Sequence, residues 1–282
     1  MINPEKLQEV VLQSFLTEVY ALKPGNVSRY SAGHDMTVDD FVNSARLVTP
    51  ILCQPELSFG ERILESVKIT QREIGCNTNL GMLLLFAPVI LAVEKTNLSD
   101  YAELQIKLQV MLENISQNDA GLVFQAIRIA RPGGLGQSEK FDVHLEPECS
   151  LLTAMNEAKN RDLIAKQYVT GFSDVFLTGC VCIKEFTRRW NSVEWAAVAC
   201  YLTFLASFAD THIQRKSGRE VAEQIKLKAI PLAEQFKNKD NPEDALNALL
   251  DFDKELKNSN INPGTTADLT AASLLVYGVS SL

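Results

Sequence analysis

Four side chains that together could hold a phosphorylated ligand lie in one loop near the start of the chain. Lys23, Arg29, His34 and Asp35 occur within residues 23–36, which also include a proline and two glycines. Glycine and proline are typical of loops whose backbone turns or is approached closely by a ligand. Cations beside a carboxylate suit a phosphate group that is bridged by a metal ion. Taken alone, the loop fits a solvated connector equally well.

Four further polar segments that contain glycine occur where helices are expected to begin or end. They are residues 75–81, with Asn77, Thr78 and Asn79; residues 131–144, with Asp142; residues 210–218, with Asp210, Arg215 and Lys216; and residues 262–269, with Gly264 and Asp268. The N-terminus of a helix has free N–H groups and a partial positive charge, which suit phosphate. The recurrence of such segments strengthens the prediction of a phosphate-binding site.

The elements that position these loops are predicted to be helices, because apolar residues recur at helical spacing and alternating β-branched runs are scarce. The expected helices cover residues 7–19, 38–50, 60–73, 79–94, 101–114, 119–130, 151–172 with a break near Arg161, 174–189, 193–208, 219–236, 242–257 and 267–278. Residues 132–147 form the longest irregular segment, and a loop of this length is often functional. We therefore expect a single all-α domain over residues 1–282, with functional loops at helix ends.

The composition limits the classes of partner. The chain has 282 residues, a formal net charge of −8 and no basic stripe, so nucleic acid is not an expected partner. The apolar run over residues 80–93 is shorter than the ~20 residues of a membrane span, and residues 1–10 do not read as a signal segment. The six cysteines show no zinc-binding spacing and are expected to be buried in a reducing compartment. We therefore expect a cytoplasmic protein without a membrane partner.

Taken together, the polar segments resemble the triphosphoribosyl-dephospho-coenzyme A synthase family over about residues 10–280. The matching motifs are Lys23-Pro24-Gly25, Arg29, Gly33-His34-Asp35-Met36, Gly75-Cys76-Asn77-Thr78, Gly133-Gly134-Leu135-Gly136, Asp142-Val143, Asp210-Thr211, Arg215, Gly218, and Asn262-Pro263-Gly264 followed by Ala267-Asp268-Leu269. Each motif is weak alone, but their common order along the chain indicates kinship.

The resemblance implies an all-helical fold and a magnesium-dependent reaction. In that reaction ATP donates a 5-triphosphoribosyl group to the 2′-hydroxyl of 3′-dephospho-coenzyme A, and adenine leaves. Breaking the bond at the anomeric carbon builds positive charge on the ribose, which nearby carboxylates stabilise, while another carboxylate can accept the proton of the acceptor. The expected partners are therefore small molecules, namely ATP and an acceptor similar to dephospho-coenzyme A.

The resemblance also assigns roles to residues. Asp35, Asp210 and Asp268 are expected to include the metal ligands and the general base, and His34 is a further candidate for a ligand or proton carrier. The triphosphate is expected to contact Lys23, Arg29, Arg215, Lys216 and Gly264, while Asn77, Thr78 and Asn79 are expected to bond ribose or phosphate. An aspartate at a helix end is often only an N-cap, but the resemblance favours a catalytic role for these residues, so we expect Asp210→Asn or Asp268→Asn to abolish turnover with little change in thermal unfolding.

Departures from the family pattern leave other functions open. Asn79 and Leu80 stand where the family has His and Lys, and Thr265 replaces a glycine. The chain is therefore interpreted as a divergent member that transfers a (tri)phosphoribosyl group. The alternatives are action in the biosynthesis of another cofactor, for example a one-carbon pterin-type cofactor; a metal-dependent N-glycosyl hydrolase; or an inactive nucleotide-binding protein. The sequence leaves the oligomeric state open, including a homo-oligomer.

Overall fold

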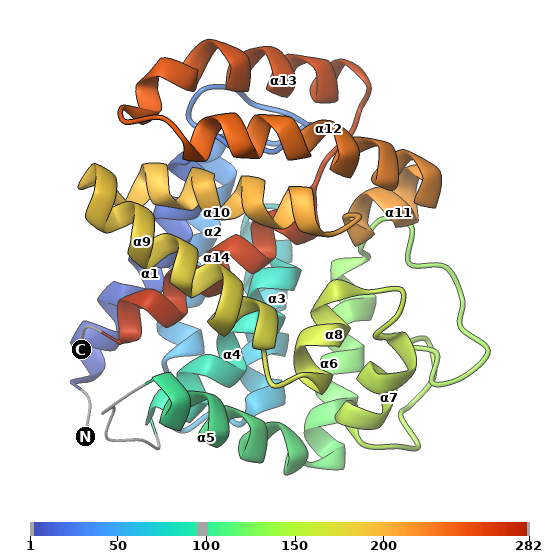
Figure 1. Ribbon diagram of the computed structural model, residues 1–282. Coiled ribbons are helices and arrows are strands. Elements are labelled where there is room, and N and C mark those ends of the chain that lie inside the picture. Colours follow the sequence, from blue (N-terminus) through green and yellow to red (C-terminus); the bar gives the residue numbers. More distant parts are fainter. Residues whose placement is uncertain (1–2, 95–100, 281–282) are drawn as a thin grey trace.

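The computed structural model describes residues 3–94 and 101–280 (Figure 1). Over these residues the chain forms fourteen α-helices with one short π-helix and one 3-10 helix, and no β-strand. This confirms the prediction of a single all-α domain.

The helices follow one another with short connections. The first half contains α1 (Pro4–Tyr20), α2 (Val38–Leu52), α3 (Phe59–Glu73), α4 (Leu80–Glu94), α5 (Tyr101–Glu113), α6 (Gln117–Ala130), α7 (Leu151–Ala158) and α8 (Leu163–Val169). The second half contains the π-helix η1 (Val175–Cys180), α9 (Val181–Trp190), α10 (Val193–Ser207), α11 (Thr211–Ser217), α12 (Arg219–Lys237), the 3-10 helix η2 (Pro242–Ala245), α13 (Leu246–Asn258) and α14 (Gly264–Val279).

Most predicted helices lie within a few residues of the observed ones, and one local difference has a clear cause. The sequence predicts no helix over residues 209–218, but Asp210 caps a short helix there, α11, by accepting hydrogen bonds from the N–H groups of His212 and Ile213. The break predicted near Arg161 is confirmed, because Asp162 caps α8 in the same way. Residues 131–150 between α6 and α7 are irregular, as the sequence predicted.

Helix α14 forms the centre of the molecule and is almost entirely buried (Figure 1). It packs against α1, α4, α10 and η1. Its polar residues do not disturb this burial, because the hydroxyls of Thr270 and Ser273 donate to the backbone carbonyls of Thr266 and Leu269. The polar first turn of α14 is therefore held in place by the buried, apolar remainder of the same helix.

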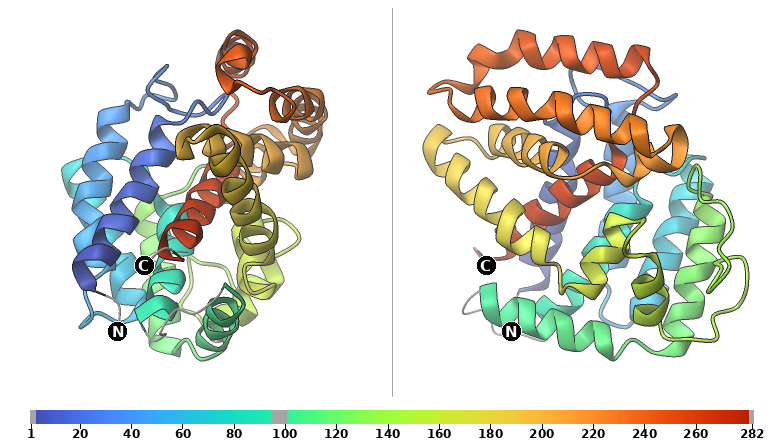
Figure 2. Two further views of the ribbon diagram at one scale, coloured as in Figure 1. Left: turned by 60° about the vertical axis from the view of Figure 1, so that its left-hand side comes forward. Right: turned by 45° about the vertical axis from the view of Figure 1, so that its right-hand side comes forward.

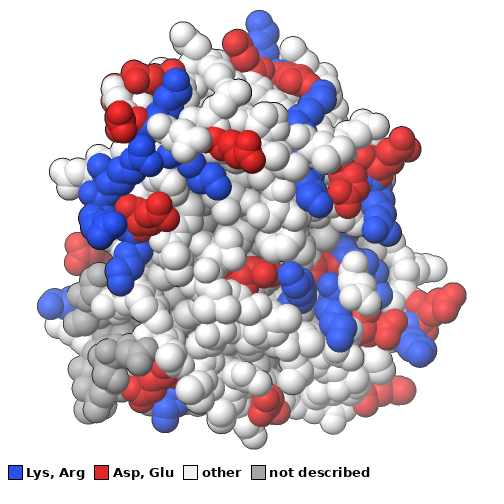
Figure 3. Space-filling model, in the orientation of Figure 1, with Lys and Arg blue, Asp and Glu red and all other residues white. Residues whose placement is uncertain are grey.

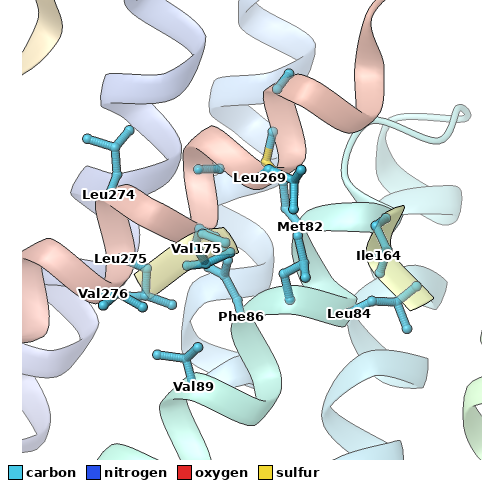
Figure 4. Close-up of a cluster of buried hydrophobic side chains, with 14 of the residues drawn as sticks. Met82, Leu84, Phe86, Val89, Ile164, Val175, Leu269, Leu274, Leu275 and Val276 are labelled. Carbon is cyan, nitrogen blue, oxygen red and sulfur yellow. The ribbon is translucent and has the colours of Figure 1, made fainter. Parts of the chain in front are cut away.

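Helix α4 is apolar around its whole circumference, which is typical of a helix buried on all sides. Figure 4 shows Met82 and Phe86 of α4 lying against Leu269 and Leu275 of α14, with Val175 of η1 between the two helices. Full burial of such side chains stabilises the fold by roughly 1.5–3 kcal/mol each. The packing fixes the start of α4 against the start of α14, and the predicted site lies where these two helices begin.

Helices α12 and α13 form an outer layer on one side of α10 and of the loop that follows α1 (Figure 2). Acidic and basic side chains are mixed over the face shown in Figure 3, and this face has no continuous basic stripe. In residues 3–94 and 101–280, no single helix combines the length and apolarity needed to cross a bilayer, although the bent pair of α10 and α11 meets both criteria together.

Candidate active site

A cavity of about 440 Å³ opens between the starts of α4, α8 and α14, helices α6, α7 and α11, and the irregular segment before α7. Pockets of roughly 300–1,000 Å³ are typical of sites for small molecules, including nucleotides. Of the residues predicted for the site, those that line the cavity are Asn77, Thr78, Asn79, Arg215, Gly264 and Asp268. The remaining predicted residues, His34, Asp35, Lys23, Arg29, Asp210 and Lys216, lie outside its wall.

Asp268 is a carboxylate that lines the cavity from α14, at the centre of the fold. It projects from the second turn of α14 onto Gly81 at the start of α4, where a Cβ atom would lie 2.1 Å from its Oδ2 atom. No residue in the described part of the chain donates a hydrogen bond to it. Burial raises the pKa of Asp268 well above its usual range, and the negative charges of Glu18 and Asp210 raise it further. An unpaired carboxyl group with a raised pKa can accept a proton from a ligand in the cavity.

Asp210 has a different environment, although it shares the same motif type. It is fully buried and accepts four hydrogen bonds, from the N–H groups of His212 and Ile213 and from both the N–H and the hydroxyl of Thr266. Burial raises the pKa of Asp210, and the hydrogen bonds from Ile213 and Thr266 lower it in part. All of its partners belong to the protein, so Asp210 ties α11 to α14 and does not face a ligand.

His34 and Asp35 lie in a turn near the surface. Both have left-handed backbones, with φ of 57° and 59°. The His34 ring is bonded to the Gly25 carbonyl at 2.9 Å and to the Asn260 side chain at 3.1 Å, and Asp35 is exposed. The structure therefore does not place Asp35 beside Asp268: the loop that carries Asp35 lines the cavity through Asn26 and Met36, whereas Asp35 itself is exposed.

The predicted metal ligands Asp35, Asp210 and Asp268 do not form a cluster. Asp35 is exposed, Asp210 is saturated by protein donors, and only Asp268 faces the cavity. Within residues 3–94 and 101–280, no group of three or more His, Cys, Asp and Glu side chains could hold a metal ion.

Two of the predicted phosphate ligands are occupied by protein partners. Lys23 is fully buried, forms an ion pair with Glu18 at 2.7 Å and donates to the Val27 carbonyl at 2.9 Å. Burial lowers the pKa of Lys23, while the charge of Glu18 raises it in part. Arg29 lies at the surface and pairs with Glu194. Because neither cation reaches the cavity, neither is placed to bind a triphosphate there.

The loop after α1 builds a wall of the site instead of supplying its cations. Asp253 of α13 holds the loop by accepting hydrogen bonds from the N–H of Gly25 at 2.8 Å and the hydroxyl of Ser31 at 2.6 Å. Asn26 then lines the cavity, and its amide donates to Asn262 at 2.8 Å. The sequence contained no signal for Asp253, since it lies in an ordinary charged helix.

The polar residues before α4 line the cavity, but their side chains are engaged locally. Asn77 accepts a hydrogen bond from the N–H of Leu80 and so caps α4. Thr78 and Asn79 are buried and donate to the hydroxyl of Ser44 at 2.8 and 2.6 Å. These residues therefore shape the start of α4.

Two arginines bring positive charge to the cavity. Arg215 pairs with Asp162 at 2.7 Å, and its Nε atom is buried without a hydrogen-bond partner in the described structure. Arg161 donates from Nη2 to the hydroxyl of Ser138 in the irregular segment. Sequence reasoning missed Asp162, although its position directly before an apolar run is typical of an N-cap.

The irregular segment closes against α11 through its glycines. A Cβ atom at Gly134, which has φ of 73°, would lie 2.5 Å from the Arg215 carbonyl oxygen, and one at Gly133 would lie 2.8 Å from Cε of Lys216. Lys216 therefore covers this segment from the outside. Asp142 of the same segment lines the cavity, and hydrogen bonds from the N–H groups of His144 and Ser138 lower its pKa.

Gly264 makes room for a histidine. A Cβ atom at Gly264 would lie 2.3 Å from Nδ1 of His212, and His212 lines the cavity. Burial, together with the nearby charges of Arg215 and Lys216, lowers the pKa of His212 to about 4. His212 is therefore a neutral imidazole at physiological pH.

Comparisons with known proteins identify the family of the chain. The family model described as ATP:dephospho-CoA triphosphoribosyl transferase matches residues 4–282. The chain belongs to this family. A crystal structure from Archaeoglobus fulgidus, provisionally named a triphosphoribosyl-dephospho-coA synthase, is 26% identical with a TM-score of 0.64 and covers 84% of this chain and 97% of its own. No curated protein matches the chain significantly.

Membership of the triphosphoribosyl transferase family confirms the resemblance seen in the motifs and the assignment as a transferase. The comparisons give no support to a pterin-type pathway, a hydrolase or an inactive binding protein. The departures from the family pattern have local structural explanations, since Asn79 bonds Ser44 and Leu80 is buried.

Proposed function

We propose that this chain transfers the triphosphoribosyl group of ATP to a hydroxyl of dephospho-coenzyme A and releases adenine, with Asp268 as the general base. The observation that carries the proposal is the environment of Asp268, a carboxyl group on the wall of a nucleotide-sized cavity to which none of the described residues donates a hydrogen bond. The family to which the chain belongs supplies the reaction class.

The step is a displacement at the anomeric carbon of the ribose. The acceptor oxygen forms a bond to that carbon, the bond to N9 of adenine breaks, and the electron pair of that bond leaves with the base. Asp268 accepts the proton of the acceptor hydroxyl, and its raised pKa brings its basicity closer to that needed at neutral pH. The triphosphate stays on C5′ and serves to hold the donor in place.

The triphosphate is assigned to the side of the cavity formed by the irregular segment and α11. Arg215 and Arg161 are the cations in the lining residues, and Asp162 orients Arg215 through its ion pair. Arginine guanidinium groups match phosphate geometry well, so these two side chains offset the overall negative charge of the protein locally.

Magnesium is part of the reaction that the family resemblance implies, and the donors near the arginines fit it. Asp142 lines the cavity and remains ionised, because backbone N–H groups lower its pKa. Mg²⁺ is commonly bound by one or two carboxylates together with substrate phosphates and water. Asp142 would thus hold a magnesium ion that ATP carries, and the bound ion would neutralise phosphate charge. Asp268 remains available to accept the proton.

The cellular setting follows from the same proposal. The six cysteines, all within the described residues, are unpaired, which suits a reducing compartment, and we place the enzyme in the cytoplasm. Its proposed partners are small molecules.

The reaction is tested by incubating the protein with ATP and magnesium, with and without 3′-dephospho-coenzyme A, and measuring adenine by chromatography. We expect adenine to appear only with the acceptor, one molecule for each triphosphoribosylated product. Adenine released equally fast without the acceptor would indicate a hydrolase. ATP that binds without any adenine release would contradict the proposed transfer.

Gly81→Ala tests the contact that positions the carboxyl group of Asp268. The added Cβ collides with Oδ2 of Asp268, so we expect kcat to fall on the order of tenfold or more. Such overpacking costs about 1–3 kcal/mol of the free energy of unfolding. Gly121→Ala in α6 is the matched control, because its Cβ would meet nothing closer than 3.8 Å. Wild-type kcat in Gly81→Ala would show that the position of Asp268 does not matter.

A further inference from the structure

His212 and Asp268 lie along one face of the start of α14. The His212 ring rests on Gly264, and Asp268 follows four residues later in the same helix. Positions four apart lie one above the other, with a rise of about 6 Å. When a ribose loses one group and gains another at its anomeric carbon, one protein group can act on each side of the sugar. The separation between positions 264 and 268 suits two such groups. Both side chains line the cavity, so they bracket a space that fits the reacting sugar.

The backbone of His212 is held in place by the protein and not by a ligand. Its backbone N–H donates to Oδ1 of Asp210 at 2.8 Å, and Asp210 also accepts from Thr266 in the first turn of α14. Thr211 reinforces this connection by donating to the hydroxyl of Thr265 at 3.1 Å. A glycine at residue 264 is required for the ring to fit, since any side chain would displace it. A side chain that the protein holds in place without bonding its polar atoms is typical of a group that acts on a ligand.

The His212 side chain has unused hydrogen-bonding capacity. Its Nε2 atom is buried and has no partner among the described residues, and no described residue bonds its Nδ1 atom. A buried imidazole nitrogen without a partner costs free energy, because a hydrogen bond to water is lost. A ligand in the cavity can supply a partner for Nδ1, because that atom lies against Gly264, which is part of the cavity wall.

We propose that His212 binds the leaving adenine and donates a hydrogen bond to one of its ring nitrogens while Asp268 acts on the acceptor at the other side of the ribose. This inference rests on the proposed function. As the bond from the anomeric carbon to N9 breaks, its electron pair moves onto the purine, and the hydrogen bond from neutral His212 stabilises that charge. The proton of the acceptor goes to Asp268, and the adenine anion takes a proton from water after it leaves.

The surroundings of His212 favour the base over the triphosphate as its ligand. Arg215 lies one turn further along α11 and Lys216 follows it, so cations for phosphate are already present. An uncharged imidazole adds little to phosphate binding but makes a good hydrogen bond to a neutral heterocycle.

The test compares kcat with ATP and with two analogues, 7-deaza-ATP and 3-deaza-ATP. Each analogue lacks one ring nitrogen of adenine, N7 in the first and N3 in the second. With ATP and the acceptor, we expect His212→Ala to lower kcat on the order of 100-fold. With the analogue that lacks the contacted nitrogen, the variant and the wild type should differ by no more than about twofold. Inhibition by inorganic tripolyphosphate should be unchanged, since that probe has no base.

The controls separate this inference from the proposed function. Asp251→Asn alters an exposed residue of α13 outside the cavity wall and should keep wild-type kcat with all three nucleotides. If His212→Ala does not fold, His212→Gln is used in the same measurement. An equal loss of kcat with all three nucleotides would overturn the role of His212 and leave the transferase intact, whereas a wild type that releases no adenine would overturn the proposed function itself.

Discussion

Asp268→Asn is expected to lower kcat for acceptor-dependent adenine release by on the order of 10²–10⁴-fold, the usual contribution of a positioned general base. The amide keeps the shape of the carboxyl group against Gly81 but cannot accept the proton. The melting temperature should not fall, because no described protein donor loses a partner and a desolvated charge is removed. Asp251→Asn, an exposed substitution in α13, is the control. Wild-type kcat in Asp268→Asn would rule out Asp268 as the base.

The raised pKa of Asp268 also affects pH dependence. Activity should fall as the pH drops through this pKa, at a higher pH than for an ordinary carboxyl group. For stability the sign is reversed. The folded state holds its proton more tightly than the unfolded state, so the stabilisation is present below the unfolded pKa and is lost as the pH rises through the folded one. Asp268→Asn should remove this component of the pH dependence.

Asp210→Asn is expected to have its main effect on stability. Replacing one carboxylate oxygen by an NH₂ group deprives two buried donors of their acceptor, either at Thr266 or at the N–H groups of His212 and Ile213. Each unsatisfied donor costs about 1–3 kcal/mol, so the free energy of unfolding should fall by about 2–5 kcal/mol. Relief of the buried charge offsets part of this cost. Chemical denaturation measures the change.

A comparison of the two variants therefore distinguishes the roles of Asp210 and Asp268. The structure replaces the sequence-based expectation that both variants unfold at nearly the wild-type temperature. We now expect Asp210→Asn to be destabilised and Asp268→Asn to be stable but inactive. An Asp210→Asn protein with unchanged unfolding and no turnover would show instead that Asp210 acts in the reaction.

Helix positions could be predicted because they depend on local patterns. Apolar residues at helical spacing, and caps such as Thr37 before α2, are determined within a few residues of the chain. The short helix α11 escaped prediction because its polar sequence resembles a loop, and Asp210 stabilises it only together with α14.

The site was predicted as a set of segments, and only part of each segment faces the cavity. Lys23 looked like a phosphate ligand, but Glu18, one turn earlier in the chain, buries it in an ion pair. Arg29 and Asp35 are exposed, although their loop, which Asp253 of α13 holds, lines the cavity through Asn26. Burial and partners that come from distant segments cannot be read from residue type alone.

The sequence by itself determined the all-α fold, the family and the segments that build the site, because each depends on spacing and on the order of motifs along the chain. The tertiary structure decided which aspartate is free to react. The sequence does not distinguish Asp210 from Asp268. In the structure Asp210 accepts hydrogen bonds from α11 and α14, whereas Asp268 packs against Gly81, which has no side chain to bond it. Whether a carboxylate serves the fold or a ligand depends on the donors that packing brings to it.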